Sequence, residues 1–215
     1  MRAVQPPGAR GSLKWLQVAV NDRPDLLDHP AIGRVEWRSP LRLDDYAEYR
    51  DRAFLDCVGI ARLNDRLTGF WPTRGPQWDA LGVTDGGIVL VEAKAHLGEL
   101  LSPPTAAGMA SRARIDAAFA ATQAAIGATP ATDWCTAYYQ LANRIAHLWF
   151  LRQIGVDARL LLVSFINDRE MNGPDTVEVW DLAYAAAFAS LGIGPDNALM
   201  AWVHHVHPDV RAMAG

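Results

Sequence analysis

Cysteine and long apolar runs are both scarce in this chain of 215 residues. Its two cysteines, Cys57 and Cys135, lie far apart and form no CxxC pair. A disulfide framework or a thiolate zinc site needs more cysteines, or closer ones, so neither is expected. Both thiols are instead expected to be buried.

The apolar runs are too short to cross a membrane, which takes roughly 18 or more uncharged residues. A representative run, residues 159–166, has the length of a strand. The N-terminus carries Arg2 and Arg10, but a Pro-Pro-Gly sequence at 6–8 stands where a signal peptide has its apolar region. We therefore expect a soluble, cytoplasmic protein without membrane association.

An excess of positive charge is also lacking, because the net charge is −4. Proteins that coat nucleic acid non-specifically neutralise many phosphates with basic residues, so any nucleic-acid contact here should be local. Of the 20 basic residues, only Lys14 and Lys94 are lysines. An ammonium group supports chemistry that a guanidinium, with its very high pKa, does not, so both lysines merit inspection.

The order of apolar patterns, caps and turns predicts an α/β (α+β) domain. The expected elements are a helix over 41–63, a short extended segment at 69–72, strands at 77–83 and 88–94, helices over 106–126 and 133–154, a strand at 159–166, a helix over 179–191 and a last strand or short helix at 198–206. We expect one domain over residues 1–215, with a mixed β-sheet flanked by helices. Its core should span about residues 41–166, between an N-terminal arm and a C-terminal extension.

A β-hairpin is the strongest local signal, because the sequence Thr-Asp-Gly-Gly at 84–87 separates two strand-like runs. In the register that this turn fixes, three pairs oppose one another: Val83 with Ile88, Leu81 with Leu90, and Asp79 with Glu92. Side chains alternate along a strand, so all of these share one face with Lys94. That face is apolar at one end and charged at the other.

The charged end of the hairpin predicts a metal site. Asp79 and Glu92 would face each other with Cβ atoms about 5 Å apart, and like charges placed there repel unless a cation lies between them. Mg²⁺, or Mn²⁺ as a substitute, suits this position, because magnesium is commonly held by one or two carboxylates plus water and substrate phosphate. The carbonyl of Ala93 is a further candidate ligand. Lys94 would reach the same phosphate and stabilise its charge or orient water. The alternative is a surface hairpin on which Lys94 merely neutralises two exposed acids.

The segments Pro76-Gln77-Trp78-Asp79 and Val91-Glu92-Ala93-Lys94, joined by the hairpin, resemble the PD-(D/E)XK nuclease superfamily. In that superfamily an Asp on one strand and a (D/E)xK triplet on the next form the magnesium site. This chain departs from the name in having Trp78 before Asp79, with the proline three positions earlier. The resemblance implies a restriction-endonuclease-like fold, catalytic roles for Asp79, Glu92 and Lys94, and DNA rather than RNA as the substrate.

The resemblance also implies a metal-supporting acidic residue on the first helix and a substrate-facing Gln on a later helix. Glu48 and Gln140 hold comparable places, and Gln140 opens a polar patch with Asn143 and Arg144. For Glu48 and Gln140 the alternative is a solvated helix face.

Several histidines and tryptophans are weaker candidates. His96 would continue the face of Glu92 and Lys94 if the strand ran on, with Glu99 just beyond, although both suit a solvent-facing strand end. Trp71 and Trp78 are candidates for base stacking, whereas most other tryptophans should pack in the core. The C-terminal histidines allow a transition-metal interpretation: His204, His205 and His207, with Asp209 as a partner.

Three functions follow, and the intact set of Asp79, Glu92 and Lys94 favours the first, because a module that does not cut has no need of all three. The first is a magnesium-dependent nuclease that hydrolyses phosphodiester bonds in DNA. The second is a catalytically silent module on the same fold that binds nucleic acid or protein, which the negative net charge favours slightly. The third is a metal-dependent hydrolase of a smaller phosphoester. Monomer and homodimer are both compatible with the sequence.

Overall fold

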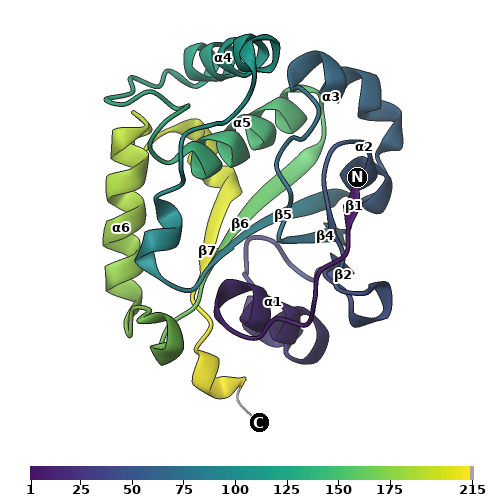
Figure 1. Ribbon diagram of the computed structural model, residues 1–215, viewed down its shortest axis with the longest axis vertical. Coiled ribbons are helices and arrows are strands. Elements are labelled where there is room, and N and C mark those ends of the chain that lie inside the picture. Colours follow the sequence, from purple (N-terminus) through teal and green to yellow (C-terminus); the bar gives the residue numbers. More distant parts are fainter. Residues whose placement is uncertain (214–215) are drawn as a thin grey trace.

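The computed structural model describes residues 1–213. Its centre is a five-stranded mixed β-sheet flanked by helices, which confirms the predicted α/β architecture (Figure 1). The strands of this sheet, in spatial order, are β2 (Glu36–Ser39), β4 (Ala80–Thr84), β5 (Gly87–Lys94), β6 (Asp157–Ser164) and β7 (Val203–Val206). β2, β4 and β5 are antiparallel, whereas β5, β6 and β7 run parallel.

The helices cover the two faces of the sheet unequally (Figure 1). They are α1 (Gly11–Asp22), α2 (Arg52–Cys57), α3 (Asn64–Phe70), α4 (Met109–Ile126), α5 (Tyr139–Gln153) and α6 (Val177–Ser190). α1 packs on the face that carries Val89 and Val91, and the other helices contribute to the larger core over Leu81 and Leu90. Every residue of β5 is buried, as expected for a central strand with helices on both faces.

Short 3₁₀ helices connect these elements. They are η1 (Pro24–Leu27), η2 (Arg42–Asp44), η3 (Ala61–Leu63), η4 (Leu97–Leu100), η5 (Arg169–Met171), η6 (Ala198–Trp202) and η7 (Val210–Ala212). η6 and β7 together fill the segment predicted as a last strand or short helix. Within residues 1–213, no helix is both long and apolar enough to cross a membrane.

The predicted helix over 41–63 is wrong. That segment holds η2, the two-residue strand β3 (Glu48–Tyr49), α2 and η3. Asp45, Tyr46 and Asp51 have φ angles of 53°, 50° and 54°, and a right-handed helix cannot contain them. The apolar spacing therefore reflects burial of separate short elements rather than one helix.

Two neighbouring predictions also need correction. Residues 69–72, expected as an extended segment, include the end of α3, and the third antiparallel strand is instead β2. The helix expected from 133 begins at Tyr139, because Tyr138 has a φ of 58° and the Asp133 carboxylate accepts a hydrogen bond from the Cys135 amide.

The N-terminal segment, expected as an arm, is built into the fold. β1 (Arg2–Ala3) pairs with β3, and α1 buries Trp15 and Leu16 against the sheet. The Trp15 indole also donates a hydrogen bond to the buried Asp168 carboxylate at 2.8 Å. The Gln5 side chain donates a hydrogen bond to Glu48 of β3, and Glu48 lines a small pocket together with Asp79 and with Ala93 of β5.

Candidate active site

The candidate site lies where β4 separates from the C-terminal end of β5. The ladder between them confirms the predicted register, since Leu81 opposes Leu90 and Val83 opposes Ile88. The last paired residues are Ala80 and Val91. Beyond them the chain before β4 turns away, and Trp78 forms a bridge with Tyr49 of β3 instead.

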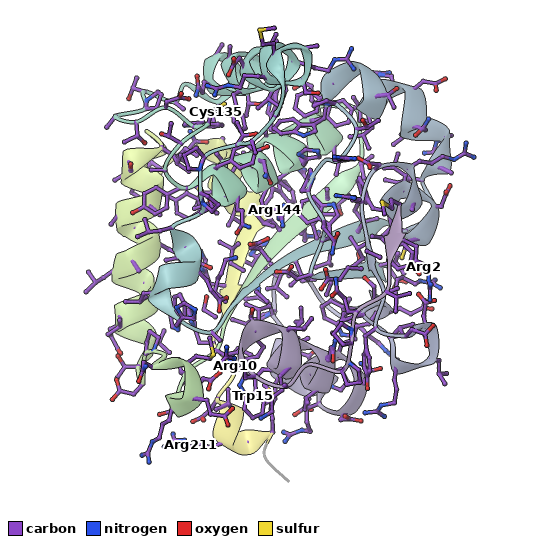
Figure 2. The ribbon with its side chains drawn as sticks, in the orientation of Figure 1. Arg2, Arg10, Trp15, Cys135, Arg144 and Arg211 are labelled. Atoms are coloured by element: carbon purple, nitrogen blue, oxygen red, sulfur yellow. The ribbon has the colours of Figure 1, made fainter. Side chains whose placement is uncertain are left out.

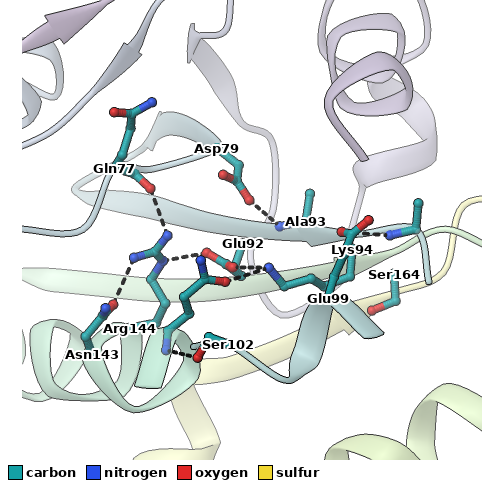
Figure 3. Close-up of polar contacts among 12 residues, drawn as sticks. Gln77, Asp79, Glu92, Ala93, Lys94, Glu99, Ser102, Asn143, Arg144 and Ser164 are labelled. Carbon is teal, nitrogen blue, oxygen red and sulfur yellow. Dashed lines mark hydrogen bonds and ion pairs between the residues drawn. The ribbon is translucent and has the colours of Figure 1, made fainter. Parts of the chain in front are cut away.

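Asp79 does not form the cross-strand pair with Glu92 that the sequence predicts. It precedes β4, and its carboxylate accepts a hydrogen bond from the backbone amide of Ala93 at 2.8 Å (Figure 3). Where the β4–β5 ladder stops, the Asp79 carboxylate thus accepts the hydrogen bond from β5 that a backbone carbonyl would accept in a continued ladder. This contact holds the Asp79 carboxylate at the open end of the sheet, next to β5.

Glu92 and Lys94 lie two residues apart on β5 and share one face, as predicted. Their side chains form a buried ion pair, with Lys94 Nζ 2.5 Å from Glu92 Oε1. Only 3% of Glu92 and 8% of Lys94 is exposed. Two buried charges of this kind are tolerated because each compensates the other.

α5 completes the site from the opposite side (Figure 3). Arg144 Nε lies 2.6 Å from Glu92 Oε2, and Gln140 Oε1 accepts a hydrogen bond from Lys94 Nζ at 3.2 Å. Asn143 and the carbonyl of Gln77 accept further hydrogen bonds from the Arg144 guanidinium. Figure 2 shows Arg144 near α5 and the sheet, well within the outline of the molecule, whereas Arg2 and Arg211 lie near its edge.

The indole ring of Trp78 packs against the guanidinium group of Arg144. The guanidinium carbon lies 4.8 Å from the centre of the indole ring, within the range of a cation–π contact. Trp78 is fully buried, so it cannot stack on a base, and the corresponding prediction is wrong. Trp71 is 3% exposed, packs against His147 and Phe119, and does not line the pocket of the candidate site.

Glu48 also reaches the site, although from β3 rather than from a helix. Its Oε2 accepts hydrogen bonds from Gln77 Nε2 at 2.6 Å and from Gln5 Nε2 at 3.0 Å. Glu48 and Asp79 line the same pockets. Glu48 therefore lies at the pocket, but on the strand β3 and not on the helix that was predicted for this segment.

These side chains line one pocket of about 460 Å³. Arg50 and Arg74 add positive charge to its wall, beyond Lys94 and Arg144. The segment 102–106 lines it from another side, where Ser102 Oγ accepts a hydrogen bond from the Gln140 amide. Acidic groups and cationic groups thus face one concave space.

Burial and mutual charge set the ionisation of the acidic groups. Burial, followed by the charge of Glu92, raises the pKa of Asp79 to about 8. Burial also raises the pKa of Glu48. Burial alone would raise the pKa of Glu92, but Arg144 and Lys94 outweigh it, so the pKa is lowered. Glu92 is therefore ionised at neutral pH, whereas Asp79 carries a proton easily.

The residues fit a divalent cation in part. Three carboxylates, those of Glu48, Asp79 and Glu92, face two buried cationic groups, those of Lys94 and Arg144. Among residues 1–213, Asp79 Oδ1 has no hydrogen-bond partner, so it is free to act as a ligand. Both oxygens of Glu92 already contact a cationic side chain, which a metal would have to share or replace.

A self-contained metal cage is not found. Within the part of the chain that the structure describes, no group of three or more His, Cys, Asp or Glu side chains is placed to hold a metal ion. This applies to the C-terminal histidines as well as to the pocket. Magnesium sites with one or two carboxylates complete their coordination with water and substrate phosphate, so Asp79 and Glu92 remain suitable for that ion.

The remaining predicted residues lie outside the pocket. His96 Nε2 lies 3.2 Å from Glu99 Oε1 just beyond β5, and neither residue lines the pocket. His204 stacks near His29, while His205 and His207 lie against each other, so the histidines form two separate pairs. Cys135 is buried and Cys57 is partly buried, and both are free thiols.

Sequence reasoning missed the part played by Gln77, which contacts both Glu48 and Arg144. It also missed Arg50 and Arg74, because nothing in their local sequence separates them from other surface arginines. Arg144 was visible within a polar patch of a predicted helix, but its partner Glu92 is 52 positions away. Only the fold brings them together.

The chain was compared with protein-family models, with curated proteins and with solved structures. None of the three comparisons found a match.

Proposed function

We propose that this protein is a magnesium-dependent nuclease that hydrolyses phosphodiester bonds, with DNA as the favoured substrate. One observation carries the proposal: Asp79, Glu92 and Lys94 line a single pocket at the end of β5, and Lys94 Nζ lies 2.5 Å from the Glu92 carboxylate. The resemblance of these residues to the PD-(D/E)XK pattern supports the same function.

Asp79 and Glu92 would hold the ion, and the carbonyl of Ala93 is a third candidate oxygen. When bound, Mg²⁺ polarises the phosphoryl group and makes water a better nucleophile near neutral pH. Asp79, with its pKa raised to about 8, would give up its proton when the ion binds. This proton release makes ion binding stronger as the pH rises.

Lys94 is suited to act on the phosphate itself. Glu92 and Gln140 fix its ammonium group by hydrogen bonds at 2.5 and 3.2 Å. The contact with Glu92 raises the pKa of Lys94 against the effect of burial, so it is positively charged. A fixed positive charge of this kind stabilises negative charge that develops on phosphate oxygens.

Arg50 and Arg74 would bind neighbouring phosphates. Both line the pocket, and Arg74 is exposed. Arginine binds phosphate through several donors, whereas lysine acts as a point charge. A few local cations suit a chain whose net charge of −4 disfavours broad non-specific binding.

A non-cutting module on the same fold is the second candidate, and one observation favours it. Lys94 and Arg144 each contact one carboxylate oxygen of Glu92, so the negative charge of Glu92 is compensated without a metal. In that case the pocket would bind phosphate or an acidic segment of a protein without hydrolysis.

Cleavage of plasmid and single-stranded DNA, with Mg²⁺, Mn²⁺ or a chelator, separates the two functions. We expect cleavage that the chelator abolishes and that Lys94→Ala lowers by about 100-fold or more. Lys14→Ala is the matched control, because Lys14 lies on α1 and pairs with Glu170 at 3.7 Å. Cleavage that survives Lys94→Ala would disprove the assignment to this pocket, and binding without cleavage in either metal would favour the module.

A further inference from the structure

A second, smaller pocket adjoins the candidate active site. Gly75 and Pro76 line both pockets, so this turn forms a shared wall. The second pocket has a volume of about 130 Å³. Three aromatic rings line its other walls, those of Phe54 from α2, Trp71 after α3 and His147 from α5, beside polar residues that include Asp51 and Arg52.

His147 presents an unused acceptor to this pocket. Its ring is 1% exposed, and Nδ1 lies 2.8 Å from the carbonyl oxygen of Asn143. A carbonyl only accepts hydrogen bonds, so Nδ1 carries the ring proton and Nε2 keeps its lone pair. Burial lowers the pKa of His147 to about 3, so the ring is neutral. Nε2 has no hydrogen-bond partner among residues 1–213.

The position of Gly75 shows where Nε2 points. A Cβ atom added at Gly75 would lie 3.3 Å from Asp51 Oδ1, 3.3 Å from Trp71 Cδ1 and 3.8 Å from His147 Nε2. The space beside this glycine is therefore the space that Nε2 faces. The turn is fixed, because the Asp51 carboxylate accepts hydrogen bonds from the amides of Arg74 and Gly75 at 3.2 and 2.9 Å.

Size and chemistry together define the ligand. A closed cavity of about 150 Å³ takes one benzene ring, so this pocket of about 130 Å³, which opens to solvent, suits a single ring better than the two rings of a purine. Aromatic side chains such as Trp71 favour contact with a flat, π-bonded ring. His147 Nε2 is an unpaired acceptor, and the Asp51 carboxylate lies beside the same space, so a ligand that brings an N–H donor is favoured.

We propose that this pocket binds a pyrimidine base of the nucleic acid whose phosphate occupies the candidate active site. The inference rests on the proposed function, since the larger pocket must hold the phosphate attached to that base. The base would lie across Gly75 and Pro76 and donate an N–H group to His147 Nε2. The amino group of cytosine and the imide N–H of thymine both supply this donor.

Binding of dCMP, TMP, dAMP and dGMP to the whole protein, measured by calorimetry, tests the inference. We expect both pyrimidine nucleotides, or one of them, to bind about tenfold or more tightly than the purine nucleotides. The comparison of dCMP with TMP shows which donor the pocket prefers. In ¹⁵N spectra the His147 Nε2 resonance should shift when the preferred nucleotide is added.

Two variants localise the effect. Gly75→Ala puts a methyl group into the pocket and should abolish the pyrimidine preference, and His147→Phe should weaken pyrimidine binding about tenfold or more by removing the acceptor. Gly69→Ala is the matched control, because a Cβ there meets nothing within 4 Å. If His147→Phe does not fold, Gly75→Ala and the ¹⁵N shift decide the question.

Equal binding of purines and pyrimidines, an unchanged Nε2 resonance or a preference that survives Gly75→Ala would overturn the inference. Its failure is distinguishable from failure of the proposed function. A protein that cleaves DNA without any base preference at this pocket refutes the pyrimidine site alone. A protein that shows the preference but never cleaves refutes the nuclease alone.

Discussion

The two ends of the β4–β5 hairpin face differ in what holds them together. At the turn end, Leu81 and Leu90 oppose each other in a regular ladder and are fully buried. At the far end the ladder stops after Ala80, and Asp79 and Glu92 bind the Ala93 amide and the cationic side chains instead.

The two ends of this face therefore have different roles: the apolar end stabilises the fold, and the charged end carries the groups suited to chemistry. Burial of the apolar end stabilises the folded protein, and a smaller side chain there leaves a cavity that lowers stability. The charged end stops the backbone pairing, which leaves an open pocket beside β5. We therefore expect substitutions at the two ends to differ in their response to charge, pH and metal.

The largest effect should follow Glu92→Leu at the charged end. This change leaves Lys94 and Arg144 buried without their shared carboxylate, and loss of one partner of a buried ion pair costs about 3–5 kcal/mol. Urea denaturation measures the free energy of unfolding. Glu36→Leu is the control, because its pair with Arg38 is exposed and should contribute about 1 kcal/mol or less. Equal losses in the two variants would contradict the buried network.

A comparable or smaller effect should follow Leu90→Ala at the apolar end. Removing a fully buried leucine side chain costs about 2–5 kcal/mol, depending on how far the cavity collapses. Leu43→Ala removes the same atoms from a fully exposed position and should change stability by less than about 0.5 kcal/mol. Magnesium should not alter the loss of stability in Leu90→Ala. A loss that depends on magnesium would contradict the difference between the two ends.

The last expected effect, which is spread over several pH units, concerns the pH dependence of stability. The pKa of Asp79 is about 8 in the folded protein and about 4 when unfolded, so the folded state binds the extra proton between these values. Stability from this group is therefore present at low pH and is lost as the pH rises toward 8. Asp79→Asn cannot lose a proton, so relative to wild type it should gain stability from pH 5 to pH 8.5. Parallel denaturation series at both pH values measure the difference, and parallel curves would contradict the assigned shift.

The hairpin was predictable because all of its information is local. The turn at 84–87 sets the register, and alternation then places Glu92 and Lys94 on one face. The stop of the ladder at Ala80 was not predictable, because it depends on the Asp79 contact with Ala93 and on the bridge from Trp78 to β3.

Long-range contacts explain the other errors. The broken segment at 41–63 depends on positive φ angles at Asp45, Tyr46 and Asp51, which apolar spacing does not report. Trp78 lies beside the motif in sequence, yet Arg144 from α5 covers it. A residue can therefore be close to a motif along the chain and still be unreachable for a substrate.

Manganese binding followed by electron paramagnetic resonance tests the central claim, that the charged end of the hairpin binds a divalent cation. The account predicts that wild type binds one Mn²⁺ per chain at the pocket, that Mg²⁺ competes for it and that Asp79→Asn removes it. Asp85→Asn, at the exposed turn of the same hairpin, should bind Mn²⁺ like wild type. Wild type that binds no Mn²⁺, or Asp79→Asn that binds it equally well, would contradict the claim.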